Sequence, residues 1–238
     1  MEALQKGAVN KPLGTRGPPN EHRQEKAVGA LQSYYQRWGK RCMDLILASG
    51  ALILVSPILA VCVIAVRLGS GRPMLFTQPR IGRGGKAFLL LKLRSMKAGS
   101  QPGPKVTSAG DVRVTRVGRW LRRTKLDELP QLVNVIRGDM SLVGPRPEVP
   151  EYVALYSEQQ RQVLRCRPGI TSPAALDYID EEAILARAES PEQFYREFVM
   201  PRKLEIDLRY CRSISIQSDL TLLLRTARRI WTRRHPAA

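Results

Sequence analysis

The sequence predicts an α/β protein that is mostly helical, carries a small antiparallel sheet and sits on a membrane as a monotopic protein. Three observations predict this fold class: an uncharged apolar segment near the N-terminus, two apolar runs around a glycine-rich turn, and basic segments with helical spacing. The chain of 238 residues is long enough for one domain with a core and a membrane element. We expect a tail over residues 1–36, a membrane segment over 37–68 and a cytosolic-face domain over 69–238.

The N-terminal tail is rich in Gly, Pro, Gln, Asn and charged residues, and it has no apolar periodicity. Such a composition buries too little apolar surface to fold, so we expect disorder there. The apolar run starts too late for a secretory signal peptide, and no small-residue cleavage site follows it convincingly.

The segment from Leu45 to Val66 has no charge, and as one straight helix its roughly 22 residues would extend roughly 33 Å, enough to cross a bilayer. Pro57 lacks an N–H and clashes with the preceding turn, whereas Ser56 can bond back to a freed carbonyl. Both flanks are basic, and positive charge prefers the cytoplasm. These features favour a re-entrant helix-break-helix hairpin broken at Ser56-Pro57. A single spanning helix is the alternative, and it satisfies only one of the basic flanks: Arg37, Lys40 and Arg41 before the segment, Arg67 and Arg72 after it.

Two further elements follow the apolar segment. Gly82, Gly84 and Gly85 separate two apolar-rich runs and predict a β-hairpin whose second strand lies near Lys86–Leu93. After an expected exposed loop over 98–110, a run dense in Arg and Lys over 113–125 has apolar residues at helical spacing. It predicts a short basic amphipathic helix on anionic lipid, with a solvated helix face as the alternative.

The second half of the chain predicts helices. Residues 151–165 and 180–210 show mixed charge with a period near 3.6, and Ser190-Pro191-Glu192 is a favourable helix start. The C-terminal stretch LTLLLRTARRIWTRRH predicts another basic amphipathic helix that can dock on a membrane.

Charge and composition restrict the chemistry. The chain has 39 Lys and Arg against 21 Asp and Glu, a formal charge of +18, which indicates an anionic partner: nucleic acid, anionic lipid or a phosphate-bearing substrate. Both histidines, His22 and His235, lie in the tails, which excludes His-dependent triads and His-rich metal sites. The four cysteines form no CxxC pair and are expected to be reduced.

The run TKLDELPQLVNVIRGDMSLVGPRPE over 124–148 holds two adjacent carboxylates, Asp127 and Glu128, in this basic surrounding. The apolar periodicity after them predicts a helix that ends at Gly138, and Pro130 is acceptable only in its first turn. We therefore expect Asp127 as the N-cap and Glu128 at N1. Asp127 can simply cap the helix. An ionised Asp can also attack phosphorus if cations and a metal reduce the repulsion, and oxygen ligands favour Mg²⁺.

These residues resemble the bacterial sugar transferase family, and more closely the small monotopic phosphoglycosyl transferases. The resemblance runs over roughly residues 38–225 and rests on KRCMDLILA with Ser56-Pro57, TQPRIGRGGKAF, KLRSM, DVRVTRVGRWLRRTKLDELPQ, NVIRGDMSLVGPRP and RPGIT. The long central motif is far more specific than any short pattern.

The resemblance implies an enzyme that moves a phosphosugar from a UDP-sugar to polyprenol (undecaprenyl) phosphate, with release of UMP, as the first membrane step of glycan assembly. It implies a ping-pong mechanism with a covalent phosphosugar on Asp127, and Glu128 acting at Mg²⁺ or as a base. It also implies a re-entrant hairpin at the cytoplasmic face of the bacterial inner membrane. Homodimerisation is left open, and no nucleic-acid partner is expected.

Several basic residues fit phosphate binding, because Lys and Arg pair with phosphate oxygens. A surface salt bridge is the alternative for each of them. The candidates are Lys92, Arg94, Arg122, Arg123, Arg146 and Arg167. Asp139 and Glu148 are weaker candidates for a metal site.

The chain departs from the family pattern after RPGIT, where it continues SPAALDYIDEE instead of Gly, an aromatic or Leu, and Gln-Val. This segment is a candidate for sugar or nucleotide choice. Two other functions remain open. One is a non-catalytic basic module that binds membrane or nucleic acid, although aromatic residues make up only 6% of the chain. The other is a glycosyltransferase that makes a polyprenyl monophosphate sugar and releases UDP.

Overall fold

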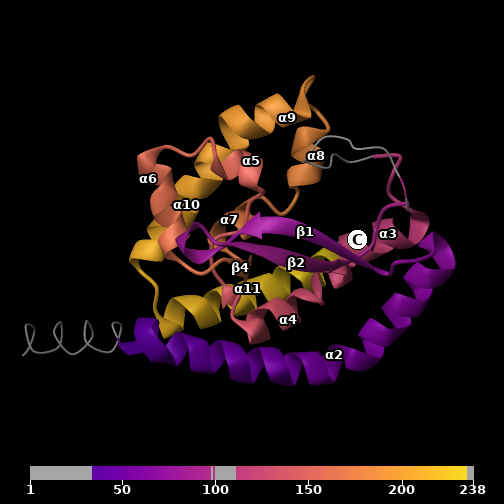
Figure 1. Ribbon diagram of the computed structural model, residues 1–238, viewed down its shortest axis with the longest axis horizontal. Coiled ribbons are helices and arrows are strands. Elements are labelled where there is room, and N and C mark those ends of the chain that lie inside the picture. The colour runs from indigo at the N-terminus through magenta and orange to yellow at the C-terminus, as the bar shows by residue number, and fades with distance from the viewer. Residues whose placement is uncertain (1–33, 98, 100–110, 235–238) are drawn as a thin grey trace, which may run out of the picture.

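The computed structural model describes residues 34–97, 99 and 111–234. The predicted N-terminal tail lies almost entirely outside this range, and so does most of the predicted loop over 98–110. In the described residues the fold is mostly helical, with one antiparallel hairpin and one short parallel strand pair (Figure 1). This confirms the predicted mostly helical fold with a small antiparallel sheet.

The apolar segment forms one continuous helix. A short π-helical turn, η1 (Tyr35–Gly39), leads into α2 (Lys40–Ser70), and Pro57 lies inside α2. The predicted break at Ser56-Pro57 is therefore wrong. Pro57 cannot donate to the carbonyl of Ile53, and the Ser56 hydroxyl donates to that same oxygen at 2.8 Å. The hydroxyl thus replaces the missing backbone donor, and the helix continues, curving toward α3 at its C-terminal end (Figure 1).

Both ends of α2 are attached to the same body. At the N-terminal end the Tyr35 hydroxyl donates to Asp219 Oδ2 at 2.6 Å, and Asp44 Oδ1 accepts from the Ser141 hydroxyl at 3.0 Å. At the C-terminal end the Ser70 hydroxyl donates to Thr115 Oγ1 at 3.2 Å. The helix therefore lies along one side of the molecule instead of projecting away from it.

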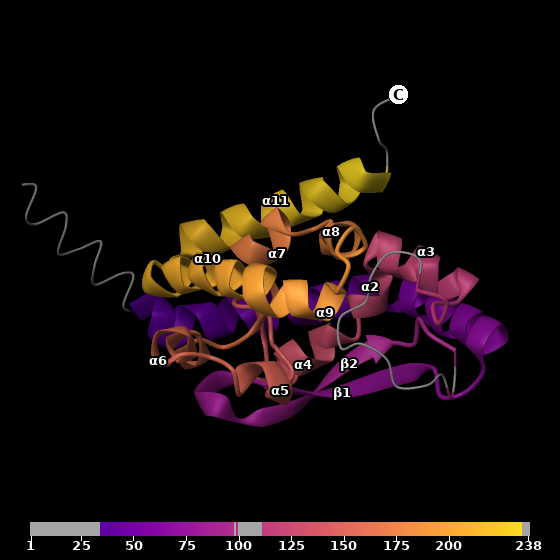
Figure 2. The same ribbon diagram turned by 90° about the horizontal axis from the view of Figure 1, so that it is seen from above.

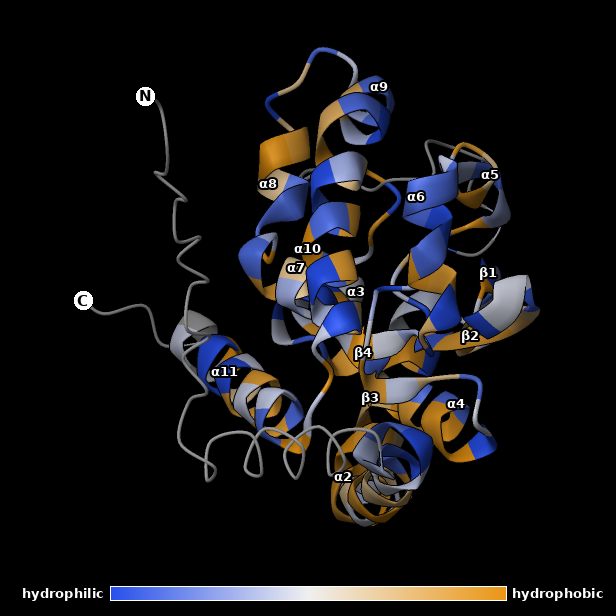
Figure 3. Cartoon of the chain, turned by 90° about the vertical axis from the view of Figure 1, so that its left-hand side faces the viewer, coloured by the Kyte–Doolittle hydropathy of each residue, from blue (hydrophilic) through white to orange (hydrophobic). Residues whose placement is uncertain are grey.

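The outer side of α2 is apolar. Among the described residues α2, together with η1, is the one helix long and apolar enough to cross a membrane, and only 11% of its most apolar stretch is buried. Viewed along its axis, α2 is mostly hydrophobic, whereas α6 and α10 are largely hydrophilic (Figure 3). A core helix of a soluble protein would be buried. These features are consistent with a monotopic membrane protein.

The predicted hairpin is present. Strand β1 (Leu75–Ile81) pairs antiparallel with β2 (Ala87–Leu93), in a register that sets Leu75 opposite Leu93. The turn between them, η2 (Arg83–Gly85), uses glycine at positive φ. One side chain joins the hairpin to α4 (Gln131–Arg137): Asn134 donates from Nδ2 to the Leu89 carbonyl at 2.8 Å and accepts from the Leu91 N–H at 3.0 Å.

The predicted basic helix is also present, as α3 (Arg116–Thr124), and Thr115 caps it by accepting from the Gly118 N–H. The prediction that Asp127 caps the next helix is wrong. Lys125 takes a left-handed conformation that closes α3, a 3₁₀ turn η3 (Leu126–Glu128) follows, and α4 begins only after Pro130. The carboxylates thus lie on a tight turn between two helices. Gly138, at φ 95°, ends α4 as predicted.

A parallel strand pair was not predicted. Strand β3 (Ser141–Val143) pairs with β4 (Gly169–Thr171), which brings the GPRP and RPGIT segments side by side. Their backbones approach so closely that a Cβ on Gly169 would stand 2.1 Å from the Gly144 nitrogen. Three residues per strand are too few to show a period in the sequence.

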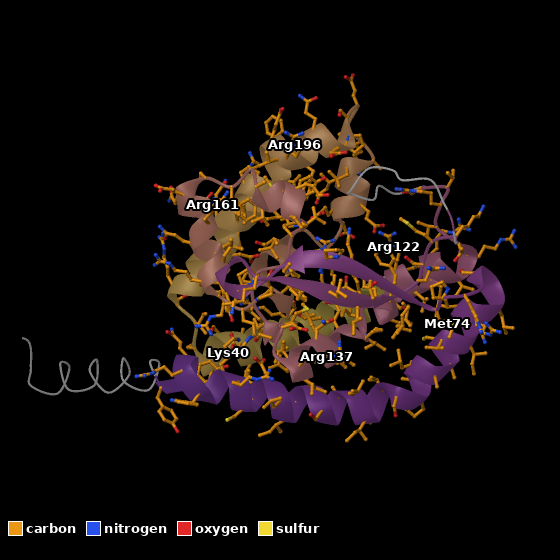
Figure 4. All side chains as sticks on the ribbon, in the orientation of Figure 1. Lys40, Met74, Arg122, Arg137, Arg161 and Arg196 are labelled. Atoms are coloured by element: carbon orange, nitrogen blue, oxygen red, sulfur yellow. The ribbon has the colours of Figure 1, made fainter. Side chains whose placement is uncertain are left out.

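Short helices complete the body, and in the view from above α10 and α11 lie on the side of α2 opposite the hairpin (Figure 2). The predicted helix over 151–165 is three short pieces, and the one over 180–210 is four, with Pro191 opening α9 as predicted. Arg161 and Arg196 mark the side of the body far from α2 (Figure 4). The elements are α5 (Pro150–Val153), α6 (Glu158–Arg161), η4 (Gln162–Arg165), α7 (Pro173–Asp177), α8 (Glu181–Leu185), α9 (Pro191–Phe194), η5 (Tyr195–Val199), α10 (Met200–Arg212) and α11 (Ile216–Arg234).

Asp207 on α10 connects three segments. Its carboxylate accepts from the Ala174 N–H in α7 at 3.2 Å and from the Arg146 N–H at 3.3 Å. Burial raises the pKa of Asp207 to about 6, although these donors pull it down.

The raised pKa predicts a pH-dependent stability. Because folding raises this carboxyl's pKa above its unfolded value, its ionisation destabilises the fold above pH 6, and the fold gains stability as the pH falls from about 6 toward 4. The gain is at most about 3 kcal/mol for a shift of this size. Asp207→Asn should remove this component, measured as a smaller rise in melting temperature between pH 7 and pH 5 than in the parent protein. An equal rise in both proteins would contradict the assignment.

The close approach of β3 and β4 predicts that Gly169→Ala destabilises the fold by about 2–3 kcal/mol, since two backbones would have to separate. Thermal unfolding in detergent measures the effect. Gly50→Ala is the matched control, because a Cβ there meets nothing within 4 Å and Ala is favoured in a helix. Equal melting temperatures for the two variants would rule out this steric explanation of the glycine.

Candidate active site

The candidate site lies where the turn η3 meets strand β2 and the segment after β3. Asp127 and Glu128 are both buried, at 6% and 9% exposure, on the turn between α3 and α4. Lys92 comes from β2, and Arg146 follows β3 between Pro145 and Pro147. Three segments far apart in the sequence therefore meet at one pair of carboxylates.

Glu128 is held by two cations. Its Oε1 accepts from Arg146 Nη2 at 2.9 Å and from Lys92 Nζ at 3.2 Å. Burial opposes ionisation of this carboxyl, but Arg146 and Lys92 outweigh it and hold the pKa of Glu128 well below its ordinary value. The ionised form of Glu128 is thus favoured, and this carboxylate holds both cations beside it.

Asp127 has a different environment. Its Oδ1 is buried and has no hydrogen-bond partner. Burial raises the pKa of the Asp127 carboxyl above its ordinary value, and the nearby Glu128 charge adds to this, while Lys92, Lys125 and Arg122 act in the opposite direction. The two adjacent carboxylates therefore differ. Glu128 is paired with two cations, whereas Asp127 keeps an oxygen without a hydrogen-bond partner near the same cations.

A second ion-pair network involves Glu148, two residues after Arg146. Arg80 on β1 donates to the Pro147 carbonyl at 3.0 Å and to Glu148 Oε2 at 3.4 Å, and the Tyr195 hydroxyl donates to Glu148 Oε1. Glu148 is thus occupied by Arg80 and Tyr195. Asp139 is occupied elsewhere, where Asn134 donates to it at 3.2 Å. Neither of these weaker metal candidates joins Asp127.

The structure gathers some predicted phosphate residues and separates others. Lys92 and Arg146 contact Glu128, and Arg122 is near enough for its charge to lower the pKa of Asp127, although it also pairs with Glu182 at 2.8 Å. Arg94 instead donates to the Arg72 carbonyl at 3.1 Å, and Arg123 is exposed on α3.

Arg167 is also separate from the carboxylate pair. Burial lowers its pKa, and the charges that act on it most are Arg41, Arg83 and Asp44. The sequence made each of the six basic residues a phosphate candidate, but spacing along the chain does not give the direction of each side chain.

Four residues of the site were not predicted as such. Lys125 acts on both carboxylates through its charge, Arg80 and Gln131 line a hollow beside Arg146, and Asp207 holds the Arg146 backbone. Lys125 and Gln131 had a signal, since both lie inside the TKLDELPQ run. Arg80 had the same kind of signal, since it lies inside the TQPRIGRGGKAF run. Asp207 had none, because only the fold brings it near Arg146.

A metal ion would find few protein ligands here. The described residues contain no group of three or more His, Cys, Asp or Glu side chains that could hold a metal. Mg²⁺, however, is commonly bound through one or two carboxylates together with substrate phosphates and water. The unpartnered oxygen of Asp127 fits that kind of site.

The arrangement suits chemistry on a phosphate. A buried carboxylate with a free oxygen can act as a nucleophile, and Lys92, Arg146, Arg122 and Lys125 supply positive charge where a phosphoryl group gains negative charge.

The chain matches a known protein family and several known proteins. Residues 35–233 match the model of the family described as bacterial sugar transferase. The chain is 40% identical over 200 residues to a UDP-glucose:undecaprenyl-phosphate glucose-1-phosphate transferase of Caulobacter vibrioides, covering 79% of this chain and 67% of that protein. It is 38% identical over 197 residues to an Escherichia coli protein with the same name, covering 79% of this chain and 39% of that protein.

A third relative carries a different sugar in its name. The chain is 34% identical over 219 residues to a UDP-N-acetylgalactosamine-undecaprenyl-phosphate N-acetylgalactosaminephosphotransferase of Aeromonas hydrophila, covering 89% of this chain and 48% of that protein. The chain thus matches less than half the length of two of these three relatives. Since the family model spans most of the chain, the chain belongs to the bacterial sugar transferase family.

Proposed function

We propose that this chain transfers a sugar 1-phosphate from a UDP-sugar to a polyprenol phosphate and releases UMP. The observation that carries the proposal is the division of the carboxylate pair: Asp127 keeps a free buried oxygen, while Glu128 holds Lys92 and Arg146 beside it. The relatives' names supply the substrate class. The sugar itself is not specified, since these names include both glucose and N-acetylgalactosamine.

The proposed reaction has two steps. Asp127 attacks the phosphorus that carries the sugar, a new carboxylate–phosphorus bond forms, and the bond to the UMP oxygen breaks with its electron pair leaving on UMP. A phosphate oxygen of the polyprenol phosphate then attacks the same phosphorus, and Asp127 leaves with its electron pair. Lys92 and Arg146 neutralise the charge that builds on the phosphoryl oxygens.

Glu128 supports this reaction as an anchor. A carboxylate held by two cations, with a pKa below its ordinary value, is a poor base at neutral pH. Its contribution is to keep Lys92 and Arg146 in position and to balance their charge. Mg²⁺ bound at Asp127 would supply further neutralisation of the donor diphosphate.

The membrane helix supports a lipid acceptor. Cys62 and Val66 of α2 pack with Leu93 and Leu121, and Leu126 joins this cluster. Leu93 follows Lys92 directly, Leu126 precedes Asp127 directly, and Leu121 lies six residues before Asp127. We propose that α2 enters the bilayer and that both of its ends stay on the cytoplasmic face of the inner membrane. The attachment of both ends to one body supports this re-entrant topology, which a bent continuous helix can adopt without a break.

The reaction predicts the outcome of Asp127→Asn. Purified protein in nanodiscs with Mg²⁺, undecaprenyl phosphate and a panel of UDP-sugars should release UMP with at least one donor. The variant should lose this activity by on the order of 1,000-fold, because an amide is not a nucleophile at phosphorus. Without acceptor lipid, the parent protein should gain the mass of one phosphosugar.

Asp139→Asn is the matched control for Asp127→Asn, since its carboxylate is bound to Asn134 and lies outside the site. We expect its activity to stay within a few-fold of the parent. Release of UDP instead of UMP would indicate a glycosyltransferase. Equal activity of the parent and Asp127→Asn would exclude the covalent mechanism.

The geometry also distinguishes two cations of the KLRSM motif. Lys92→Met should lower kcat/KM by about 100-fold or more, because it removes a cation next to both carboxylates. Arg94→Met should change it by less than about threefold, because Arg94 faces the Arg72 carbonyl. Steady-state UMP release on the same donor measures both. Similar losses in the two variants would mean that the motif acts as a single basic patch.

A further inference from the structure

Buried polar atoms without partners are concentrated at the candidate site. In the described part of the chain, five buried side-chain nitrogen or oxygen atoms have no hydrogen-bond partner, and three of them belong to Asp127, Gln131 and Arg80. The atoms are Asp127 Oδ1, Gln131 Nε2 and Arg80 Nε. Such groups are rare in folded proteins because each costs free energy. Because Gln131 and Arg80 line one hollow, their unpartnered donors indicate a ligand there.

Two of the three are donors that border the same hollow. Gln131, only 2% exposed, and Arg80 line it together with Leu90, Arg146 and Pro147. The hollow and the carboxylate pair share Arg146, which lines the hollow and also donates to Glu128 at 2.9 Å. Gln131 follows Asp127 by one helical turn, at the first position of α4.

The lining selects the chemistry of the ligand. The unpartnered atoms Arg80 Nε and Gln131 Nε2 are donors, as is the Arg146 guanidinium, so a ligand that satisfies them presents acceptor oxygens. Two guanidinium groups favour an anion with several oxygens. Arg80 and Arg146 are fixed on one side by Glu148 and Glu128, which holds them in position for such a ligand.

We propose that Gln131 and Arg80 form, with Arg146, a subsite for phosphate oxygens of the nucleotide diphosphate sugar. This inference rests on the proposed function, and it assigns a specific role to Gln131, whose amide binds the donor diphosphate beside Asp127. Gln131 would then contact substrate, although in the sequence its motif indicates only the two carboxylates Asp127 and Glu128.

The test uses nucleotide binding, which needs no turnover. In the Asp127→Asn background, in nanodiscs, calorimetry measures the Kd of UDP for the parent, Gln131→Met and Gln131→Glu. Gln131→Met keeps the length of the side chain and removes the donor, so the Kd should rise by roughly tenfold. Gln131→Glu should lose more, because a carboxylate repels phosphate. Arg80→Lys keeps the charge beside Glu148 but lacks Nε, and it should weaken binding in the same direction.

A stability measurement separates ligand binding from packing. Since Gln131 Nε2 has no partner in the protein, Gln131→Met should keep or raise the melting temperature without ligand. Gln159→Met, at an exposed position on α6, is the matched control and should change neither quantity. A UDP affinity within twofold of the parent, or an affinity lost only together with a fall in melting temperature, would overturn the subsite.

Pyrophosphate competition identifies the part of the nucleotide concerned. If Gln131→Met weakens UDP and pyrophosphate alike, the subsite binds phosphate; if pyrophosphate binding is unchanged, the amide serves the nucleoside and the proposal fails. The outcome is independent of the proposed reaction. If the parent releases UMP normally but its UDP affinity does not depend on Gln131, the subsite is wrong and the proposed reaction stands. If UDP binding depends on Gln131 but no donor gives UMP, the proposed reaction is wrong and the subsite stands.

Discussion

The candidate site depends on the ion pairs of Glu128. This one carboxylate joins Lys92 of β2 to Arg146 of the segment after β3, and it lies itself on the turn after α3. Replacing it with a neutral side chain would leave two partly buried cations without their partner, which is unfavourable. The charge of Glu128 therefore determines where three distant segments meet, and it frees Asp127 from pairing with the same cations.

Much of the fold was predictable from local sequence signals. Gly84 and Gly85 predicted the hairpin turn, Gly138 the end of α4, and the spacing of Val117 and Leu121 the helix α3. The break at Pro57 was not correctly predicted, because the rule considers the missing N–H and not the hydroxyl that replaces it. The N-cap at Asp127 failed for a similar reason: the left-handed Lys125 inserts a turn that apolar periodicity does not reveal.

The residue types of the candidate site could be predicted from the sequence, but which basic residues lie near the carboxylates could be predicted only in part. The adjacent carboxylates in a basic run pointed to Asp127 and Glu128. The KLRSM and GPRPE motifs pointed to Lys92 and Arg146, respectively. Arg94 illustrates the limit, because it lies two residues from Lys92 on the same motif yet faces the Arg72 carbonyl. Asp207 illustrates the opposite case: it accepts from the Arg146 N–H only through tertiary packing, for which a single sequence carries no signal.

Helix α2 and the candidate site are adjacent because β2 presents different residues to each. Side chains alternate along a strand, so Lys92 faces Glu128 while Leu93 packs against Cys62 and Val66 of α2. A similar division occurs on η3, where Leu126 joins the apolar cluster and Asp127 lies in the site. Asp127 is therefore one residue from the surface that α2 covers. Under the proposed function, an acceptor whose lipid stays in the bilayer would need to bring only its phosphate to Asp127, while the nucleotide would arrive from water on the other side.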